Sequence, residues 1–214
     1  MDSIKPFTIS TLFRRRGWEG FVWRITTLDD RLLMPLVTGL SQARTVDILG
    51  QELAIAHDRI EMTGHSYADL AVQAGTDTQI TVRFVSPTSF RSQERHYLLP
   101  DPVVVWQSWL NRWNGFAPAE LQYNVNTLDA VTAHVAISRY DLHTETTRYR
   151  EQERYQQIGF VGRVTYRVIR PHLLGPEILR RLNVLADYAT YCGTGHHTAR
   201  GMGQTRRVAR LDAR

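Results

Sequence analysis

The apolar positions of residues 1–75 predict a small unit of three strands and one helix. Two strand-like runs flank a turn with three consecutive arginines and a glycine, a pattern typical of a hairpin with a basic tip. After Asp29, a suitable helix N-cap, leucine and valine recur at three- and four-residue spacings as far as Leu40. The predicted elements are strands over 7–11 and 21–26, the basic turn at 14–17, the helix after Asp29, a strand over 53–60 and a surface connection over 64–75.

Residues 76–214 show a longer alternation of strand and helix patterns. Residues 79–85 alternate polar and apolar, and Pro100-Asp101-Pro102 then introduces a helix whose tryptophans recur at helical spacing. Pro176 starts a second amphipathic helix, which is followed by a glycine-rich loop and a short final strand. The other predicted elements are a turn over 86–91, a helical stretch over 120–130, and long strands over 131–150 and 156–169 that pair as a hairpin.

This order of elements predicts an α+β fold of two ferredoxin-like (RRM-like) domains in tandem. The second unit runs strand, helix, strand, strand, helix, strand, which is the ferredoxin-like order. The first unit runs strand, strand, helix, strand, so it lacks the opening strand and helix of the same pattern. We therefore expect a partial first domain over 1–75 and a second domain over 76–214 that carries the glycine-rich loop near its carboxyl end.

The composition is typical of a folded cytoplasmic protein. Of the 214 residues, 43% are hydrophobic and 22% are charged, which suits one large core or two small ones. No apolar run approaches the ~20 residues that a membrane span needs, and the amino terminus lacks the basic-then-apolar order of a secretory signal. Because Cys192 is the only cysteine, an intramolecular disulfide and a cysteine-based zinc site are both excluded.

The net charge of +5 and the sequence pI of about 9.6 predict a surface that attracts polyanions. Lys5 is the only lysine, and every other cationic residue of the Lys/Arg type is arginine. The planar guanidinium grips a phosphate with two hydrogen bonds and stacks on bases, whereas lysine offers a flexible point charge. A GC-rich genome, which favours arginine codons, explains the same bias equally well.

Residues 193–207 hold the strongest candidates for binding chemistry. Four glycines, three arginines and two adjacent histidines stand here between a predicted helix and a predicted strand. Glycines let backbone N–H groups approach an anion closely, and a nest of such groups binds phosphate. The pattern alone leaves two interpretations open, a phosphate- or RNA-binding loop and a plain structural turn. The residues are Gly193, Gly195, His196, His197, Arg200, Gly201, Gly203, Arg206 and Arg207.

This string resembles the carboxy-terminal glycine-rich loop of the CRISPR repeat endoribonucleases of the RAMP superfamily. In that family the loop reads Gly-x-Gly, then several residues that often include a basic one and Thr, then Gly-x-Gly-Gln. The matching residues are Gly193, Gly195, Thr198, Gly201, Gly203 and Gln204. Other stretches are similar to segments of the family in the same order, so the resemblance spans nearly the whole chain. These stretches are 5–10, 23–28, 84–91, 100–102 and 113–114.

The resemblance implies two ferredoxin-like domains and an endoribonuclease that needs no metal or cofactor. Family members bind the repeat stem-loop of precursor CRISPR RNA, cleave it at the base of the stem, and often stay bound as a subunit of an effector complex. We therefore expect CRISPR repeat RNA and other effector-complex subunits as partners. The expected RNA-binding residues are Gly193, Gly195, Thr198, Arg200, Gly201, Gly203, Gln204, Arg206, Arg207, Arg91, Arg148 and Arg150.

The resemblance does not extend to the family's catalytic histidine. Metal-free cleavage needs a base for the 2′-hydroxyl, an acid for the 5′-oxygen and a cation near the phosphorane. The family's usual catalytic histidine sits on or just after the first helix of the first domain, and none of the eight histidines matches that position. A downstream start codon, a split gene and a binding-only variant each fit this gap. His196 and His197 are the catalytic candidates in the loop, with Arg200 as phosphorane stabiliser; phosphate contact and plain solvation are alternative roles for both histidines.

Three functions therefore remain open. The first is an endonuclease that processes CRISPR repeats and retains the product. The second is a non-catalytic subunit that binds the repeat hairpin within a larger complex. The third is an unrelated α+β enzyme that binds a phosphorylated small molecule at the glycine loop. A steep dependence of binding on salt favours RNA over a small ligand, because many phosphates are then contacted at once.

Overall fold

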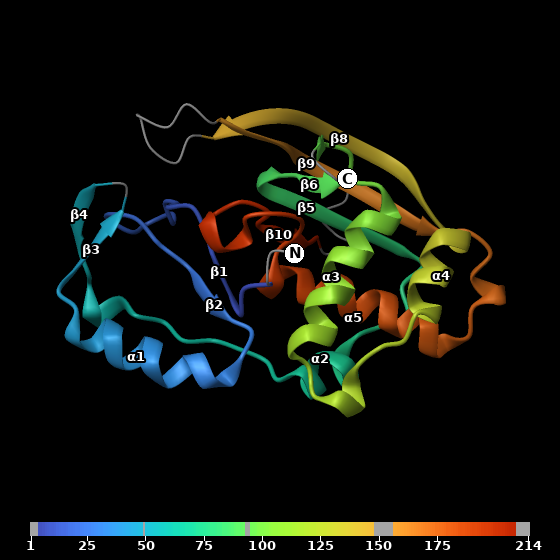
Figure 1. The fold of residues 1–214 in the computed structure, drawn as a ribbon, viewed down its shortest axis with the longest axis horizontal. Coiled ribbons are helices and arrows are strands. Elements are labelled where there is room, and N and C mark those ends of the chain that lie inside the picture. Colours follow the sequence, from blue (N-terminus) through green and yellow to red (C-terminus); the bar gives the residue numbers. More distant parts are fainter. Residues whose placement is uncertain (1–3, 49, 93–94, 148–155, 209–214) are drawn as a thin grey trace.

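The computed structural model describes residues 4–48, 50–92, 95–147 and 156–208, with a four-stranded sheet and its helices as the main body (Figure 1). The strands are β1 (Phe7–Ile9), β2 (Ile25–Thr27), β3 (Thr45–Ile48), β4 (Gln51–Ala54), β5 (Gln79–Thr88), β6 (Phe90–Ser92), β7 (Arg95–Tyr97), β8 (Val135–Thr147), β9 (Gln157–Val168) and β10 (Thr205–Arg207). The helices are α1 (Leu33–Gln42), α2 (Tyr67–Gln73), α3 (Pro102–Phe116), α4 (Asn126–His134) and α5 (Pro176–Cys192). None of these described helices is long and apolar enough to cross a membrane.

The main sheet has the strand order β10-β5-β9-β8, and each neighbouring pair is antiparallel. Helix α3 lies between β5 and β8 in the chain, and α5 lies between β9 and β10. This order of strands and helices is the ferredoxin-like arrangement. The fold predicted for the second unit is therefore confirmed.

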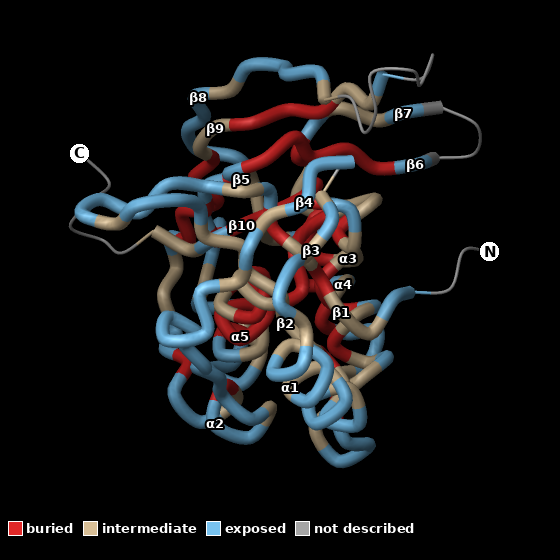
Figure 2. The backbone as a smooth tube through the Cα atoms, turned by 90° about the vertical axis from the view of Figure 1, so that its left-hand side faces the viewer, coloured by how far each residue is buried: buried red, intermediate tan, exposed pale blue. Residues whose placement is uncertain are grey.

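The core lies between this sheet and the two long helices, α3 and α5 (Figures 1 and 2). The tryptophans of α3 are buried, as their helical spacing predicted. Trp106 packs edge-on against Tyr166 of β9, with 4.9 Å between the ring centroids, and so joins the helix to the sheet. The largest fully buried side chains are Trp106, Trp109, Trp113, Tyr166, Tyr188, Phe84, Phe160, Ile80, Leu182, Leu185, Met202 and Val82.

The first unit begins with the predicted hairpin. β1 and β2 pair antiparallel, and an isolated bridge between Phe13 and Val22 continues the pairing toward the arginine-rich turn. Asp29 caps the turn of 3-10 helix that leads into α1, because its carboxylate accepts the Arg31 N–H at 3.0 Å. The strand pair and the helix are confirmed, while the domain boundary at 75/76 stays a prediction.

Residues 45–60 form a hairpin and a turn, so the predicted strand over 53–60 is wrong. β3 and β4 pair with each other, and Gly50 between them has a φ of 81°. The carboxylate of Asp47 accepts the Gly50 N–H at 3.0 Å, which fixes the turn. A turn of 3-10 helix, His57–Arg59, follows β4. Strand pairing therefore begins before residue 53, where the alternation of side chains predicted the strand to start.

Residues 64–75 contain a helix, so their prediction as a surface connection is wrong. The Ser66 side chain accepts the Asp69 N–H, and the Asp69 side chain accepts the Ser66 N–H, which is a complete capping box at the start of α2. Leu70 is buried, and the Tyr67 hydroxyl donates to the Leu28 carbonyl at 2.8 Å. The serine and aspartate three residues apart were the sequence signal for this helix.

Two boundaries in the second unit also differ from the prediction. The turn predicted over 86–91 is wrong, because β5 runs to Thr88 and β6 begins at Phe90. The helical stretch predicted over 120–130 is a short 3-10 turn, Ala119–Leu121, followed by α4. The long hairpin is confirmed as β8 and β9, which pair over twelve registered positions from Val135↔Val168 to Thr147↔Gln157.

Candidate nucleic-acid interface

The glycine-rich loop, residues 193–204, closes tightly between α5 and β10 because its backbone segments touch each other. Gly193, Gly195, Gly201 and Gly203 all have positive φ. A Cβ on Gly203 would lie 2.0 Å from the Thr194 carbonyl oxygen, and a Cβ on Gly195 would lie 2.3 Å from the Ser89 carbonyl oxygen. Only glycine fits at these two positions, on grounds of both space and backbone conformation.

The backbone N–H groups of the loop are largely used inside the protein. Gly195 donates to the Ser108 hydroxyl at 2.9 Å, His196 to the Ser89 carbonyl at 2.8 Å, and Gly203 to the Pro87 carbonyl at 3.0 Å. Gly193 likewise donates to Ala189 at 2.9 Å. The N–H groups of Gly193, Gly195 and Gly203 are therefore already paired and do not serve as donors of a phosphate nest. Contact between the loop and RNA stays a prediction. We expect the side chains on the loop's surface to make that contact.

A buried chain of hydroxyl groups supports the loop from beneath. The Trp109 indole N–H donates to the Thr194 hydroxyl at 2.8 Å, and that hydroxyl lies 2.7 Å from the Thr205 hydroxyl. The Thr205 hydroxyl in turn donates to the Gly203 carbonyl at 2.9 Å. Thr194 and Thr205 are both almost fully buried. The loop therefore rests on polar groups that are already paired, and this holds its shape before any ligand arrives.

Arg112 of α3 is a charged residue under the loop that the sequence analysis did not single out. Its guanidinium donates to the Gly195 carbonyl at 2.6 Å and to the Ser108 hydroxyl at 2.7 Å. Its hydrogen-bond acceptors in the described structure are all uncharged, and burial lowers the pKa of the guanidinium. Arginine stays charged even so. The sequence signal for Arg112 is its position three residues after Trp109, among the apolar positions of α3.

The predicted catalytic histidines lie on the surface of this loop. His196 and His197 are half-buried, and their ring centroids are 3.7 Å apart. His197 has a φ of 56°, a left-handed conformation that histidine adopts more readily than most residues. Arg200, three residues after His197, is exposed, as are Arg206 on β10 and Arg91 on β6, two residues beyond the Ser89 carbonyl that His196 contacts. The structure thus brings the two histidine rings together and joins the loop to the segment that precedes Arg91.

Gln204 connects the loop to the first unit. Its amide donates to the Ile9 carbonyl of β1 at 2.8 Å, and its carbonyl oxygen accepts a hydrogen bond from the Arg24 guanidinium. The Thr8 hydroxyl adds a bond of 2.9 Å to the Tyr191 carbonyl at the end of α5. Gln204 is nearly fully buried, so its described contacts fasten β1 to the loop.

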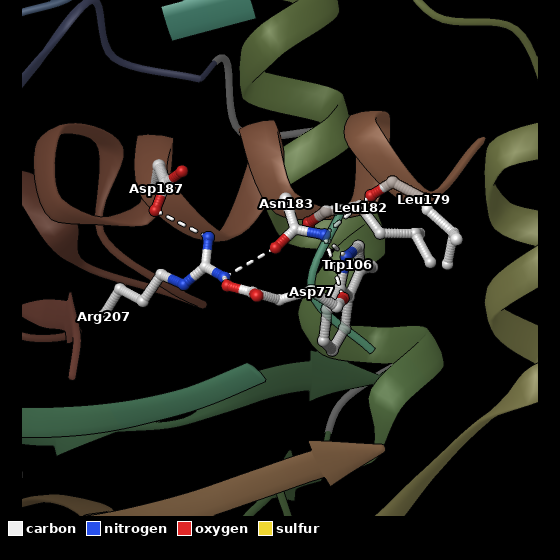
Figure 3. Close-up of polar contacts among 7 residues, drawn as sticks. All are labelled: Asp77, Trp106, Leu179, Leu182, Asn183, Asp187 and Arg207. Atoms are coloured by element: carbon white, nitrogen blue, oxygen red, sulfur yellow. Dashed lines mark hydrogen bonds and ion pairs between the residues drawn. The ribbon is translucent and has the colours of Figure 1, made fainter. Parts of the chain in front are cut away.

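Arg207 points toward Asp187 and Asn183 of α5 (Figure 3). Its guanidinium lies 2.9 Å from the Asp187 carboxylate and 2.8 Å from the Asp77 carboxylate, and it donates to the Asn183 amide oxygen at 2.6 Å. Burial raises the pKa of Asp187, and the charge of Arg207 opposes that rise. These contacts lock β10 to α5, and contact between Arg207 and RNA stays a prediction.

We expect Arg207→Met to lower the free energy of unfolding by about 1–2 kcal/mol at pH 7, because two partly exposed carboxylates lose their ion pair with the guanidinium. Without Arg207 the pKa of Asp187 rises further, so protonation relieves part of the loss. The deficit should therefore shrink as the pH falls toward the ordinary carboxyl pKa of 3.8. Urea unfolding from pH 7 to 4 measures this, with exposed Arg180→Met as the matched control. A loss of stability that grows as the pH falls would contradict the ion pairs assigned to Arg207.

Arg148 and Arg150 lie outside the described residues, between β8 and β9. Within the described part of the chain, no three His, Cys, Asp or Glu side chains are grouped so that they could hold a metal ion. The candidate interface therefore consists of His196, His197, Arg200, Arg206 and Arg91, with Arg112 beneath them.

Similarity to known proteins covers the loop and most of the chain. Residues 82–205 match the model of the family described as CRISPR-associated endoribonuclease Cas6. The CRISPR-associated endoribonuclease Cas6 of Streptococcus thermophilus is 26% identical over 200 residues, which are 92% of this chain and 79% of that protein. A solved Cas6 product complex has a TM-score of 0.82 at 26% identity, over 97% of this chain and 84% of the other. A Cas6 substrate mimic complex has a TM-score of 0.76 at 26% identity, over 95% and 85%.

Proposed function

The chain belongs to the CRISPR-associated endoribonuclease Cas6 family, and on that premise we propose that it processes precursor CRISPR RNA. It binds the repeat stem-loop, cleaves the RNA at the base of the stem without a metal ion, and retains the mature guide RNA. It works in the cytoplasm as a subunit of an effector complex. The similarity to Cas6 structures solved as product and substrate mimic complexes supports the first two steps.

The observation that carries the proposal is the cationic surface of the glycine-rich loop, which lies inside the stretch that matches the family model. Arg200 is exposed on the loop and Arg206 just after it on β10, and the half-buried Arg112 beneath the loop adds a charge with uncharged acceptors. An RNA backbone that follows the loop into β10 passes Arg200 and Arg206 in turn. Such contacts release counterions and supply the largest share of affinity for a nucleic-acid backbone.

The geometry of the histidine pair limits what it can do in catalysis. In the cleavage step, the attacking 2′-oxygen and the leaving 5′-oxygen lie in line, on opposite sides of the phosphorus. The rings of His196 and His197 are 3.7 Å apart between centroids, so no phosphate fits between them. The pair therefore serves one side of the phosphorus, as either base or acid, and the opposite side needs another group. Arg200 stabilises the charge of the phosphorane.

A labelled repeat stem-loop incubated with the chain in EDTA tests this function. We expect one cut at the base of the stem, and no cut in RNA with a 2′-deoxy nucleotide at that bond. Arg200→Gln should slow the cut about 100-fold. His196→Ala combined with His197→Ala should be little slower than the slower single variant, since the pair fills one role. His172→Ala, in the exposed Pro171–Leu173 turn, is the control. Cleavage that depends on added Mg²⁺ contradicts the proposal.

A non-catalytic subunit that binds the repeat hairpin is the second candidate. The one-sided position of His196 and His197 favours it, because the loop alone then provides only half of an acid–base pair. This candidate predicts tight binding of the stem-loop with no cut in EDTA or in Mg²⁺. The same incubation therefore separates the two functions.

A further inference from the structure

The face of the main sheet that points away from α3 and α5 carries a row of arginines. Side chains alternate between the two faces of a strand, and Val82 and Phe84 of β5 are buried in the helix-covered core. Arg83 between them therefore points to the opposite face. In the register of the sheet, Arg83 stands between Arg206 of β10 and Arg163 of β9. Three arginines thus lie side by side on three neighbouring strands, and we call this side the open face.

Two further arginines belong to the open face. Arg139 of β8 stands opposite Thr165, and Arg167 lies two residues beyond Thr165 on β9. The Thr165 hydroxyl lies 3.0 Å from that of Thr81 on β5, so these two threonines mark the middle of the face. Arg83, Arg139, Arg167 and Arg206 are all exposed, and Arg163 is half-buried.

Two pairs of like charges face each other directly in this row, Arg206 with Arg83 and Arg83 with Arg163. Neighbouring strands are about 4.8 Å apart, and like charges directly opposite each other on a sheet are destabilising. The acidic side chains at open-face positions of the described strands are Asp141, which ends the arginine row on β8, and Glu145 further along β8. Glu145 lies 3.1 Å from His143. The acids are therefore confined to the edge strand, where Asp141 stands opposite Arg163, and the row from β10 to β8 keeps three arginines to one aspartate.

The chemistry of the face selects for phosphates over bases. Proteins that read bases on a sheet stack them on aromatic side chains, and no Phe, Tyr or Trp occupies an open-face position among the registered residues of β5, β8, β9 and β10. Arginine without aromatic neighbours favours the sugar–phosphate backbone, which carries no sequence information. Arg206 follows Gln204, the last residue of the glycine-rich loop, by two positions. The open face is thus continuous with the loop.

We propose that the open face is a second RNA-binding surface, which holds the sugar–phosphate backbone of the repeat RNA where it continues beyond the glycine-rich loop, independently of its sequence. This proposal rests on the proposed function, since the loop must hold the RNA first. Bound phosphates neutralise the row of Arg206, Arg83 and Arg163 and remove the repulsion between them. The face therefore extends the footprint on the RNA without adding sequence preference.

The test is a double variant, Arg83→Gln with Arg163→Gln, compared with Arg44→Gln and Arg180→Gln, which removes two exposed arginines elsewhere. The probe is a labelled repeat stem-loop with its flanking nucleotides, titrated at several salt concentrations. We expect the open-face variant to bind about tenfold or more weakly at moderate salt, with a slope of log K against log salt smaller by about 2. The control pair should bind like wild type. Changing the flanking sequence should leave the loss unchanged.

Two results separate this inference from the proposed function. If the wild-type chain does not bind the stem-loop at low salt, the proposed function fails. If the wild-type chain binds and the open-face variant binds as tightly as the control pair, this inference alone is overturned. Melting without RNA guards against misfolding, because an open-face variant that still unfolds in one cooperative transition is folded and its loss of affinity can be attributed to the surface. A loss of affinity that depends on the flanking sequence also overturns the proposal that the open face binds RNA independently of sequence.

Discussion

Replacing Gly203 with alanine should unfold the glycine-rich loop and lower the free energy of unfolding by about 3 kcal/mol or more. The new Cβ would lie 2.0 Å from the Thr194 carbonyl oxygen, and the φ of 68° disfavours any residue with a side chain. Thr194 also donates its N–H to the Gly203 carbonyl at 2.8 Å, so the two residues cannot separate without losing that bond. Thermal unfolding should show a loss of roughly 6–12 °C for a chain of this size.

The matched control for this prediction is Gly75→Ala, because nothing lies within 4 Å of a Cβ at that position. Alanine there should be neutral or slightly stabilising, since it restricts the unfolded chain. Binding of the repeat stem-loop should fall with Gly203→Ala and stay unchanged with Gly75→Ala. Equal melting temperatures for the two variants contradict the account of the loop.

Arg112→Met should weaken binding of the repeat stem-loop at least tenfold, because it removes the charge beneath the loop and its hold on Gly195. The guanidinium bridges the Gly195 carbonyl and the Ser108 hydroxyl, with distances of 2.6 and 2.7 Å. Methionine fills similar space but leaves both acceptors without this donor, which we expect to cost about 2 kcal/mol of stability. Relief of the buried charge offsets part of the loss, so the chain should still unfold in one cooperative transition.

Arg112→Lys distinguishes charge from geometry. Lysine keeps the charge, but a single ammonium does not reproduce the two-armed bridge between α3 and the loop. We expect its affinity to lie between those of Arg112→Met and wild type, measured by filter binding at fixed salt. If the Arg112→Met variant binds the stem-loop like wild type, Arg112 does not contribute to the RNA interface.

The main sheet was predictable because its signals are local. The tryptophan spacing of α3, the proline that starts α5 and the alternation over 79–85 in β5 each agree with the final element. The order of these elements then leaves the ferredoxin-like arrangement as the natural topology. The hairpin at Gly50 and the short helix α2 were missed because turn and capping residues outweigh side-chain alternation in short segments.

The loop was recognisable in sequence, but what its residues do was not. Glycine at 195 and 203 serves close approach between backbone segments, a cause that depends on residues far away in the chain. Gln204 and Arg207 lie among the motif's polar residues, yet their side-chain partners include Ile9, Arg24, Asp77 and Asp187, which no local pattern relates to them. The arginine row on the open face likewise appears only once the register of three strands is known.

Binding of the repeat stem-loop by this chain tests the central claim most directly. The measurement is a titration of the labelled stem-loop in EDTA, beside a hairpin of the same length with a scrambled sequence, at several salt concentrations. The account predicts tighter binding of the repeat and an affinity that falls steeply as salt rises. Absence of binding at low salt, or a weak salt dependence typical of a small-molecule site, would contradict it.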